Sequence, residues 1–189
     1  MRSVERMTSA SARRWGSLVW LALPALCIFA ARVDATRGGV YSVTAFGAAG
    51  DGETDDTGAF QAALDAAAGD GGGLVTVPTG RFLIRSHLVV PGHTTLEGVW
   101  RAPVRADPVL QGTVLLAVEG KGDPEGPPFI ELRNSATLSG VSVFYPEQVK
   151  ANPPHAYPWT VRGSGVDNAT VRNVTMVNPY MAVDLGTEV

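Results

Sequence analysis

Three six-residue segments of this chain repeat one pattern. They read TTLEGV at residues 94–99, ATLSGV at 136–141 and ATVRNV at 169–174, each with threonine, an aliphatic residue, glycine or asparagine, and a final valine. Repetition at intervals of about 20–50 residues is typical of solenoids. A short strand with one apolar face cannot bury that face alone, whereas equivalent strands stacked over one another enclose a continuous interior. The repeat therefore predicts a stack of β-strand coils.

The spacing between the three copies predicts where loops interrupt the coils. The second and third copies extend into ATLSGVSVFYP and ATVRNVTMVNP, which align without a gap at an offset of 33 residues, whereas the first two copies are 42 residues apart. Unequal offsets indicate loops of different length at the corners. The residue before each final valine, which is Gly98, Gly140 or Asn173, suits a left-handed backbone turn, where most other side chains are strained.

The chain after Gly73 is also typical of short strands. Glycine (22) and proline (13) are plentiful and 17% of the residues are charged, a composition that suits many strands joined by turns. Nine short apolar runs follow one another, each bounded by Gly, Pro, Asn or Asp. We expect an aromatic-led strand upstream of each repeat copy, beginning at Phe82, Phe129 and Trp159. A β-sandwich whose phrases repeat by coincidence is the alternative fold.

An amphipathic helix is predicted before these strands. A short strand in GVYSVTAFGA leads through a loop to a segment that starts at Asp55, where apolar residues recur with helical spacing. They are Ala59, Phe60, Ala63, Leu64 and Ala67. Gly58 weakens this helix by roughly 1 kcal/mol relative to alanine, so we expect the helix to depend on docking. The run GDGGG from Gly69 should end it.

Four acidic residues cluster at the start of that helix, and they are Asp51, Glu53, Asp55 and Asp56. In a turn and helix entry, these carboxylates hydrogen-bond nearby backbone N–H groups and place negative charge where the helix dipole favours it, with Thr54 or Asp55 as N-cap. A calcium site fits less well, because an EF-hand needs glycine at position 56 and a bidentate glutamate where Ala62 stands. We interpret the cluster as structural, with metal binding and catalysis as the alternatives.

The first 35 residues differ from the rest. Arg13 and Arg14 precede an apolar run at 15–31, and a small residue ends the segment. This order is typical of a secretory signal peptide, and the run is short for a membrane span. We predict a signal peptide at 1–35, with an uncleaved anchor as the alternative, and a domain at 36–189 that is secreted or periplasmic.

The charge and cysteine content of that domain exclude several partners and chemistries. Cys27, the one cysteine, lies in the leader, so the domain has neither a disulfide nor thiol chemistry. Removal of residues 1–35 leaves 10 basic and 16 acidic residues, a net charge of −6. Nucleic acid and anionic membranes normally require a basic face, so neither is expected as a partner. The sequence does not indicate an oligomeric state.

The segment from residue 43 to 98 carries a longer motif. It contains VTAFGAAGDGETDDTGAFQAALDAAA, GGGLVTVPTGRFLI and TTLEG. This motif resembles the N-terminal signature of the pectate-lyase-like superfamily, more narrowly its rhamnogalacturonase/epimerase-like domain, related to glycoside hydrolase family 28. Phe82 stands where the family often has tyrosine. The resemblance implies an all-β solenoid, a right-handed single-stranded parallel β-helix in which the predicted helix caps the N-terminal end.

The resemblance also implies activity on polysaccharides without identifying a reaction. Enzymes of this fold act as glycoside hydrolases with paired carboxylates, or as polysaccharide lyases with Arg or Lys as base and often Ca²⁺. The matched signature contains no catalytic residue, and the charged residues of the coils read as single solvated positions, namely Arg162, Asp167, Arg172 and Asp184. We expect an N-terminal portion whose catalytic residues follow Val189, with no cofactor unless elimination requires Ca²⁺.

One segment that interrupts the repeat is a candidate ligand-binding loop. Residues 143–163, VFYPEQVKANPPHAYPWTVRG, combine aromatic rings that suit stacking on sugars with prolines that lower the ordering cost of a loop. The candidate substrate-binding residues are Tyr145, Glu147, His155, Tyr157 and Trp159. Trp159 also fits a core position at the start of a strand, and the sequence identifies no acid–base partner for His155.

These observations favour a secreted polysaccharide-active protein whose partner is a pectin-like or other acidic glycan, cleaved by hydrolysis or by elimination. Hydrolysis is favoured because the signature resembles the rhamnogalacturonase branch. The alternatives are a noncatalytic glycan-binding β-helix of the adhesin or tailspike type and a structural spacer.

Overall fold

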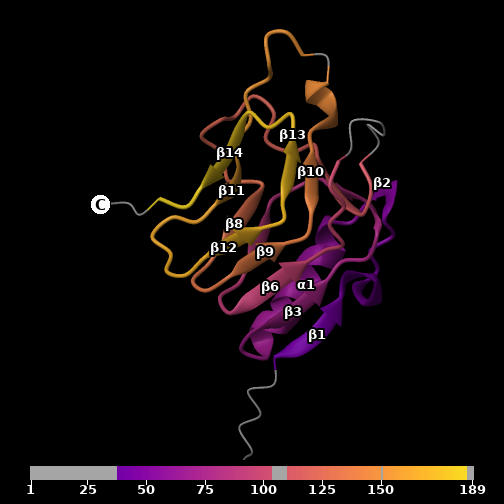
Figure 1. Cartoon of the computed structure of the whole chain (residues 1–189), viewed down its shortest axis with the longest axis vertical. Helices are drawn as coiled ribbons and strands as arrows, with labels where there is room; N and C mark the ends of the chain where they lie inside the picture. Colours follow the sequence, from indigo (N-terminus) through magenta and orange to yellow (C-terminus); the bar gives the residue numbers. More distant parts are fainter. Residues whose placement is uncertain (1–37, 104–109, 150, 187–189) are drawn as a thin grey trace, which may run out of the picture. The chain divides into compact units, whose positions relative to one another are not determined.

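The computed structural model describes residues 38–103, 110–149 and 151–186, so the predicted signal peptide lies outside the described residues. Within these ranges the chain forms the helix α1 (Thr57–Gly69), two 3-10 helices and fourteen strands (Figure 1). The 3-10 helices are Val43–Phe46 and Pro146–Gln148. The strands are β1 (Gly39–Ser42), β2 (Asp51–Asp55), β3 (Gly73–Thr76), β4 (Gly80–Ile84), β5 (Leu88–Val90), β6 (Thr94–Glu97), β7 (Thr113–Ala117), β8 (Ile130–Leu132), β9 (Thr137–Ser139), β10 (Ser142–Phe144), β11 (Trp159–Arg162), β12 (Thr170–Arg172), β13 (Thr175–Val177) and β14 (Met181–Asp184).

The strands form three parallel sheets. Two sheets have five strands, in the orders β1-β3-β6-β9-β12 and β13-β10-β7-β4-β2, and the third has four, β14-β11-β8-β5. From β3 onward, each pass of the chain contributes one strand to each sheet in turn. Neighbouring strands therefore come from successive passes, as Figure 1 shows for β6, β9 and β12. This is the parallel β-helix that the repeats and the resemblance predict.

The three repeat copies lie in register over one another. Thr95 pairs with Thr137 and Thr137 with Thr170, which reproduces the predicted offsets of the phrases in β6, β9 and β12. The aliphatic residues of the phrases, such as Leu96 and Leu138, are fully buried in the shared core. The extension of the repeat is confirmed as well, because β10 and β13 pair with Ser142 opposite Thr175. The sandwich alternative is therefore wrong.

The residues at the corners between the two five-stranded sheets are required for two different reasons. Gly140 and Asn173 adopt the predicted left-handed conformation, with φ of 73° and 50°. Gly98 does not have a positive φ. A Cβ atom there would lie 2.7 Å from the Gly140 carbonyl oxygen and 2.7 Å from the Thr113 Cβ. Glycine is required at position 98 because neighbouring coils approach closely.

The predicted alignment of the aromatic-led strands is wrong. Phe82 lies in β4, in the second sheet, whereas Phe129 and Trp159 lie at the start of the four-stranded sheet. The run FLIRSHLVVP splits into β4 and β5, and β5 is the true counterpart of β8, with Leu88 opposite Ile130. Likewise, Val161 pairs with Ile130, so Thr160 and not Trp159 aligns with Phe129. A shared aromatic residue does not determine register where a corner divides one apolar run.

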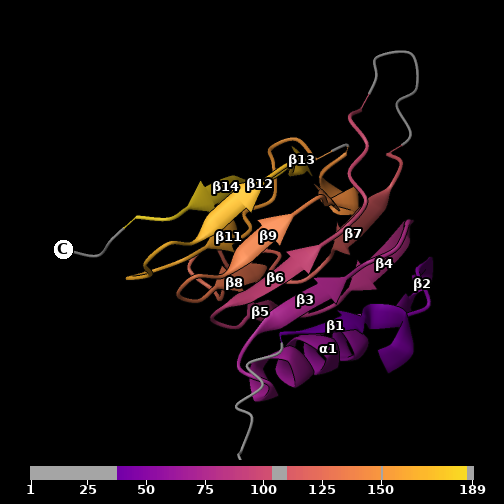
Figure 2. The same ribbon diagram turned by 60° about the horizontal axis from the view of Figure 1, so that its bottom comes forward.

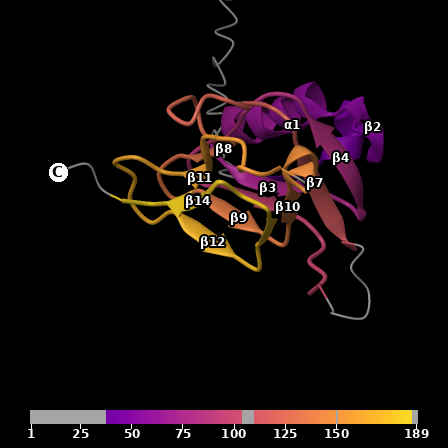
Figure 3. The ribbon, with the colours of Figure 1, turned by 90° about the horizontal axis from the view of Figure 1, so that it is seen from above.

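Helix α1 takes the place of a third strand in the first coil, between β2 and β3. Phe60, Leu64 and two alanines of its predicted apolar face are fully buried in the core. Gln61 lies beside the outer edge of β5, where its side chain accepts a hydrogen bond from the Val89 N–H (3.0 Å) and donates one to the Val89 carbonyl (3.3 Å). Figure 2 shows α1 beside β1 at one end of the stack, and Figure 3 shows it on the side away from β12, as a cap would be.

The acidic residues form hydrogen bonds within the segment that leads into α1. Asp51 accepts hydrogen bonds from the backbone of Glu53 and Thr54, and Asp55 accepts one from the Thr57 N–H at 3.0 Å. The turn interpretation is confirmed by these contacts. Two details of the prediction are wrong. The expected loop is partly strand β2, which pairs with β4, and the N-cap residue of α1 is Asp56 instead of Thr54 or Asp55. No helix among the described residues is long and apolar enough to cross a membrane.

Candidate functional site

The predicted binding loop carries two tyrosines that lie in the core. Tyr145 and Tyr157 are 1% and 0% exposed, and their rings meet edge to face with centroids 5.0 Å apart. The Tyr145 hydroxyl lies 2.9 Å from Thr160 Oγ1. Burial raises the pKa of each phenol to about 12, and the nearby Glu147 carboxylate adds to the shift of Tyr157. Neither ring is presented to solvent, so this placement does not fit the expected stacking of Tyr145 and Tyr157 on sugars.

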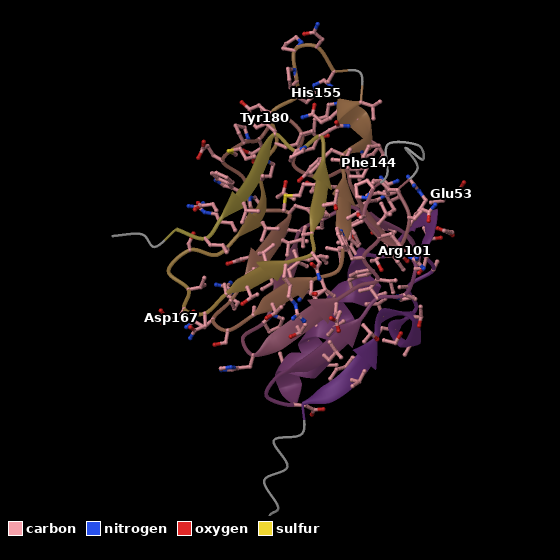
Figure 4. The ribbon with its side chains drawn as sticks, in the orientation of Figure 1. Glu53, Arg101, Phe144, His155, Asp167 and Tyr180 are labelled. Atoms are coloured by element: carbon pink, nitrogen blue, oxygen red, sulfur yellow. The ribbon has the colours of Figure 1, made fainter. Side chains whose placement is uncertain are left out.

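His155 and Trp159 occupy intermediate positions. Both are partly buried, and Trp159 pairs with Met181 as the first residue of β11. The backbone of His155 is held at both polar atoms by the Gln148 amide, which accepts from its N–H (2.9 Å) and donates to its carbonyl (2.8 Å). Figure 4 shows His155 at the same end of the coils as Tyr180. These two bonds hold the backbone of the loop at residue 155, whereas the imidazole of His155 contributes to the lowered pKa of Glu147.

Glu147 links two loops. Its Oε2 atom lies 2.8 Å from Lys121 Nζ and accepts a hydrogen bond from the Tyr157 hydroxyl at 3.3 Å. The hydrogen bond from the Lys121 ammonium is the main cause of the lowered pKa of the Glu147 carboxyl. Of the five residues predicted from sequence, the structure brings Glu147 and Tyr157 together in this polar cluster, and it adds Lys121, which sequence reasoning missed.

A pocket of about 340 Å³ adjoins this cluster. It is lined by Ser86, His87, Val118, Glu119, Gly120, Lys121, Asp123, Pro127, Phe129 and Pro158. Three of these residues, His87, Phe129 and Pro158, directly precede the strands β5, β8 and β11. Because these parallel strands are neighbours in one sheet, the loops that lead into them converge at the same edge. The pocket lies along the N-terminal edge of the four-stranded sheet.

The pocket combines hydrogen-bonding and apolar groups. Glu119, Asp123 and His87 offer acceptors or titratable groups, whereas Pro127 supplies exposed apolar surface and Phe129 lies buried behind it in the core. Lys121 brings one positive charge, which is already paired with Glu147. The described lining of the pocket therefore has two carboxylates and no unpaired lysine to balance their charge. Such an arrangement can accept hydrogen bonds from hydroxyl groups and can exchange protons with a bound ligand.

The outward face of the same sheet carries a row of charges. Arg162 is in register with Glu131 on one side and Asp184 on the other. Its Nε atom lies 3.3 Å from Asp184 Oδ2, and Arg133 lies 3.1 Å from Glu131 Oε1. The expectation that Arg162 and Asp184 are single solvated positions is therefore wrong, because parallel pairing makes them neighbours. Among the described residues, no group of three or more His, Cys, Asp or Glu side chains is placed to hold a metal ion.

Comparisons with known proteins identify the family to which this chain is similar. Residues 40–186 match the family described as rhamnogalacturonase A/epimerase, pectate lyase-like. Alginate lyase 7 of Azotobacter vinelandii is 57% identical over 44 residues, which are 23% of this chain and 5% of that protein. Plasmin and fibronectin-binding protein A of Streptococcus pneumoniae (strain ATCC BAA-255 / R6) is 49% identical over 57 residues, 30% of this chain and 8% of that protein. The aligned segments thus span less than a tenth of either relative.

Among solved structures, a glycosyl hydrolase candidate from Parabacteroides merdae ATCC 43184 has the same fold. It superposes with a TM-score of 0.57 at 20% sequence identity, over 77% of this chain and 69% of its own. The match to the family extends over most of the chain and over every strand from β2 to β14. The chain therefore belongs to the rhamnogalacturonase A/epimerase, pectate lyase-like family.

Proposed function

We propose that this protein binds a polysaccharide along the N-terminal edge of the four-stranded sheet and cleaves it there by hydrolysis, with catalytic carboxylates inside this chain in place of the catalytic residues expected after Val189. The observation that carries the proposal is the pocket in which Glu119, Asp123 and His87 meet apolar walls. Its volume lies within the ordinary range of about 300–1,000 Å³ for ligand sites. The name of a similar protein, an alginate lyase, supports a polysaccharide as the substrate class.

The pocket chemistry suits a sugar ring. Carboxylates accept hydrogen bonds from the hydroxyl groups at the edge of a pyranose, and charge-assisted bonds of this kind are the strong ones. The exposed ring of Pro127 suits the C–H face of the same sugar ring. The converging loops are tied together by the contact between Lys121 and Glu147, so less ordering remains to be done on binding.

Hydrolysis fits these residues better than elimination. Glycoside hydrolysis needs two carboxyl groups, one as acid and one as base or nucleophile, and Glu119 and Asp123 line the same pocket. Elimination needs a base that removes the proton next to a uronate carboxylate. Lys121 is a poor candidate for that base, because its Nζ atom is already in contact with the Glu147 carboxylate at 2.8 Å. Calcium would enter the reaction only if cleavage proceeded by elimination.

The charges also constrain the substrate. A uronate carboxylate inside the pocket would meet Glu119 and Asp123 without a free cation to offset them. An acidic glycan must then place a neutral unit in the pocket and its carboxylates beyond it. In this proposal the domain at 36–189 is secreted or periplasmic after removal of a signal peptide at 1–35.

A noncatalytic binding role is the second candidate. It is favoured by the similarity to a protein whose name gives a binding role, for plasmin and fibronectin, and no reaction. In that case the same pocket would hold a glycan without cleaving it.

The test is incubation of the purified protein with rhamnogalacturonan, polygalacturonan and alginate. We expect new reducing ends without the ultraviolet absorbance of unsaturated uronates, and loss of activity by at least a hundredfold in Asp123→Asn and Glu119→Gln. Glu125→Gln is the matched control, because Glu125 is exposed in the same loop but does not line the pocket. Absorbance with new ends would show elimination, and binding alone would show the noncatalytic role. If none of the three polymers is bound, the proposal fails.

A further inference from the structure

A second hollow lies on a different sheet. It has a volume of about 390 Å³ and lies on the outward side of the sheet β1-β3-β6-β9-β12, where its first three strands end. Its lining includes Ser42, Thr76, Glu97, Val77, Pro78 and Val99. None of these residues lines the pocket described above.

One wall of the hollow is a row of polar groups set by strand register. Ser42 pairs with Thr76 and Thr76 with Glu97, and each is the last residue of its strand. Their neighbours Val75 and Leu96 are buried in the interior, so the row faces outward. Adjacent strands lie about 4.8 Å apart. The row therefore places two hydroxyls and a carboxylate at regular steps. The hydroxyls of Ser42, 2.7 Å from Thr44 Oγ1, and of Thr76, which donates to the Tyr41 carbonyl at 3.4 Å, can still accept hydrogen bonds.

The other wall is apolar and rigidly held. Pro78 and Val99 form its apolar surface, whereas the Val77 side chain is 2% exposed and lies in the core, and the buried Thr113 joins these segments. The Thr113 hydroxyl lies 3.1 Å from the Val77 carbonyl, 2.9 Å from the Pro78 carbonyl and 2.8 Å from the Val99 nitrogen, which donates to it. The hollow is thus preorganised by contacts that do not involve a ligand.

Glu97 is also held in place from outside the hollow. Its Oε1 atom lies 3.6 Å from Arg172 Nη2, and Arg172 Nε donates to Ser139 Oγ at 3.2 Å on the strand between them. Arg172 therefore lies along the sheet and orients the carboxylate. Among the described lining residues, Glu97 alone carries a charge.

We propose that this hollow is a second carbohydrate subsite, which holds a neutral pyranose unit of a polysaccharide. A pyranose has hydroxyl groups at its edge and C–H groups on its faces, which match the polar row and the apolar wall. Glu97 disfavours a uronate at this position. The inference rests on the proposed polysaccharide function, but it adds a binding face that cleavage in the first pocket does not need. Two attachment points would retain the protein on a polymer more strongly than either alone.

The test is an NMR titration of the purified protein with neutral tetrasaccharides of glucose or galactose, and with tetragalacturonate. We expect a neutral tetrasaccharide to shift the amide signals of Thr76, Val77 and Val99. Glu97→Gln and Thr76→Val should each weaken that binding by about tenfold or more, the loss expected for one hydrogen bond to a charged or hydroxyl group. Thr95→Val is the matched control, because Thr95 faces outward in the same sheet without lining the hollow.

The outcomes separate this inference from the proposed function. Shifts confined to residues 118–123 would support the first pocket and overturn the second subsite. Shifts at Thr76 and Val99 that survive in Asp123→Asn would support the second subsite even if no cleavage occurs. Absence of shifts at both places with every tetrasaccharide would contradict both. Equal binding by wild type and Glu97→Gln would also overturn the second subsite.

Discussion

The buried carboxylate of Asp56 lies 2.7 Å from the backbone nitrogen of Ala49 and also accepts a hydrogen bond from Gly50 at 3.2 Å. Asp56 is 1% exposed, although it directly precedes α1. Asp56→Ala leaves both N–H groups without this acceptor, so we expect it to lower the free energy of unfolding by about 2–4 kcal/mol. Urea unfolding measures the loss. Glu53→Ala, an exposed change in the same cluster, should cost little, and an equal loss in both variants would contradict the assigned role.

The fit of α1 to the core predicts a large effect at Phe60. Its ring meets Phe82 with centroids 5.2 Å apart, and Phe60 is fully buried. Phe60→Ala should cost about 3–5 kcal/mol, because a cavity opens where the helix covers the first coil. Gly58→Ala should act in the opposite direction and stabilise by about 0.5–1 kcal/mol, since position 58 is exposed with open space around it. Thermal unfolding of the two variants tests whether docking of α1 on the first coil stabilises the fold.

The buried tyrosines predict a loss of stability at alkaline pH. The folded-state pKa of Tyr145 is raised to about 12 by burial, above the ordinary value of about 10. Its contribution is therefore complete below pH 10 and is lost as the pH rises toward 12. Tyr145→Phe removes this pH dependence, although it also removes the contact with Thr160. Melting temperatures of wild type and variant should converge between pH 10 and 12, whereas Tyr180→Phe, at an exposed position, should follow wild type.

The fold could be predicted from the sequence because its cause is repeated locally. The phrases around Leu96, Leu138 and Val171 each carry one inward aliphatic residue and a corner residue. Stacking the phrases in register buries the aliphatic residue of every copy in one core. The helix was predictable for a similar reason, since its apolar spacing lies within one segment. Position 98 shows the limit, because the close approach of Gly98 to Gly140 depends on a neighbouring coil.

The candidate site could not be predicted in the same way. Lys121 and Glu147 are far apart in the sequence and meet because loops of unequal length lead into adjacent strands. The aromatic residues of the predicted loop were a misleading signal, because Tyr145 and Tyr157 pack against each other inside the coil. The one usable signal was position, since His87, Phe129 and Pro158 each precede a strand of the same sheet.

The ion pair between Lys121 and Glu147 predicts a change in substrate preference. Both side chains are 44% exposed, so Glu147→Gln should alter the free energy of unfolding by less than about 1 kcal/mol. The same change leaves the Lys121 charge unpaired at the pocket. We expect affinity for tetragalacturonate to rise several-fold at low salt and the gain to shrink as salt is added. Isothermal titration calorimetry at two salt concentrations measures both effects. The double variant Lys121→Gln/Glu147→Gln is the control, and a gain that persists in it would exclude Lys121 as the cause.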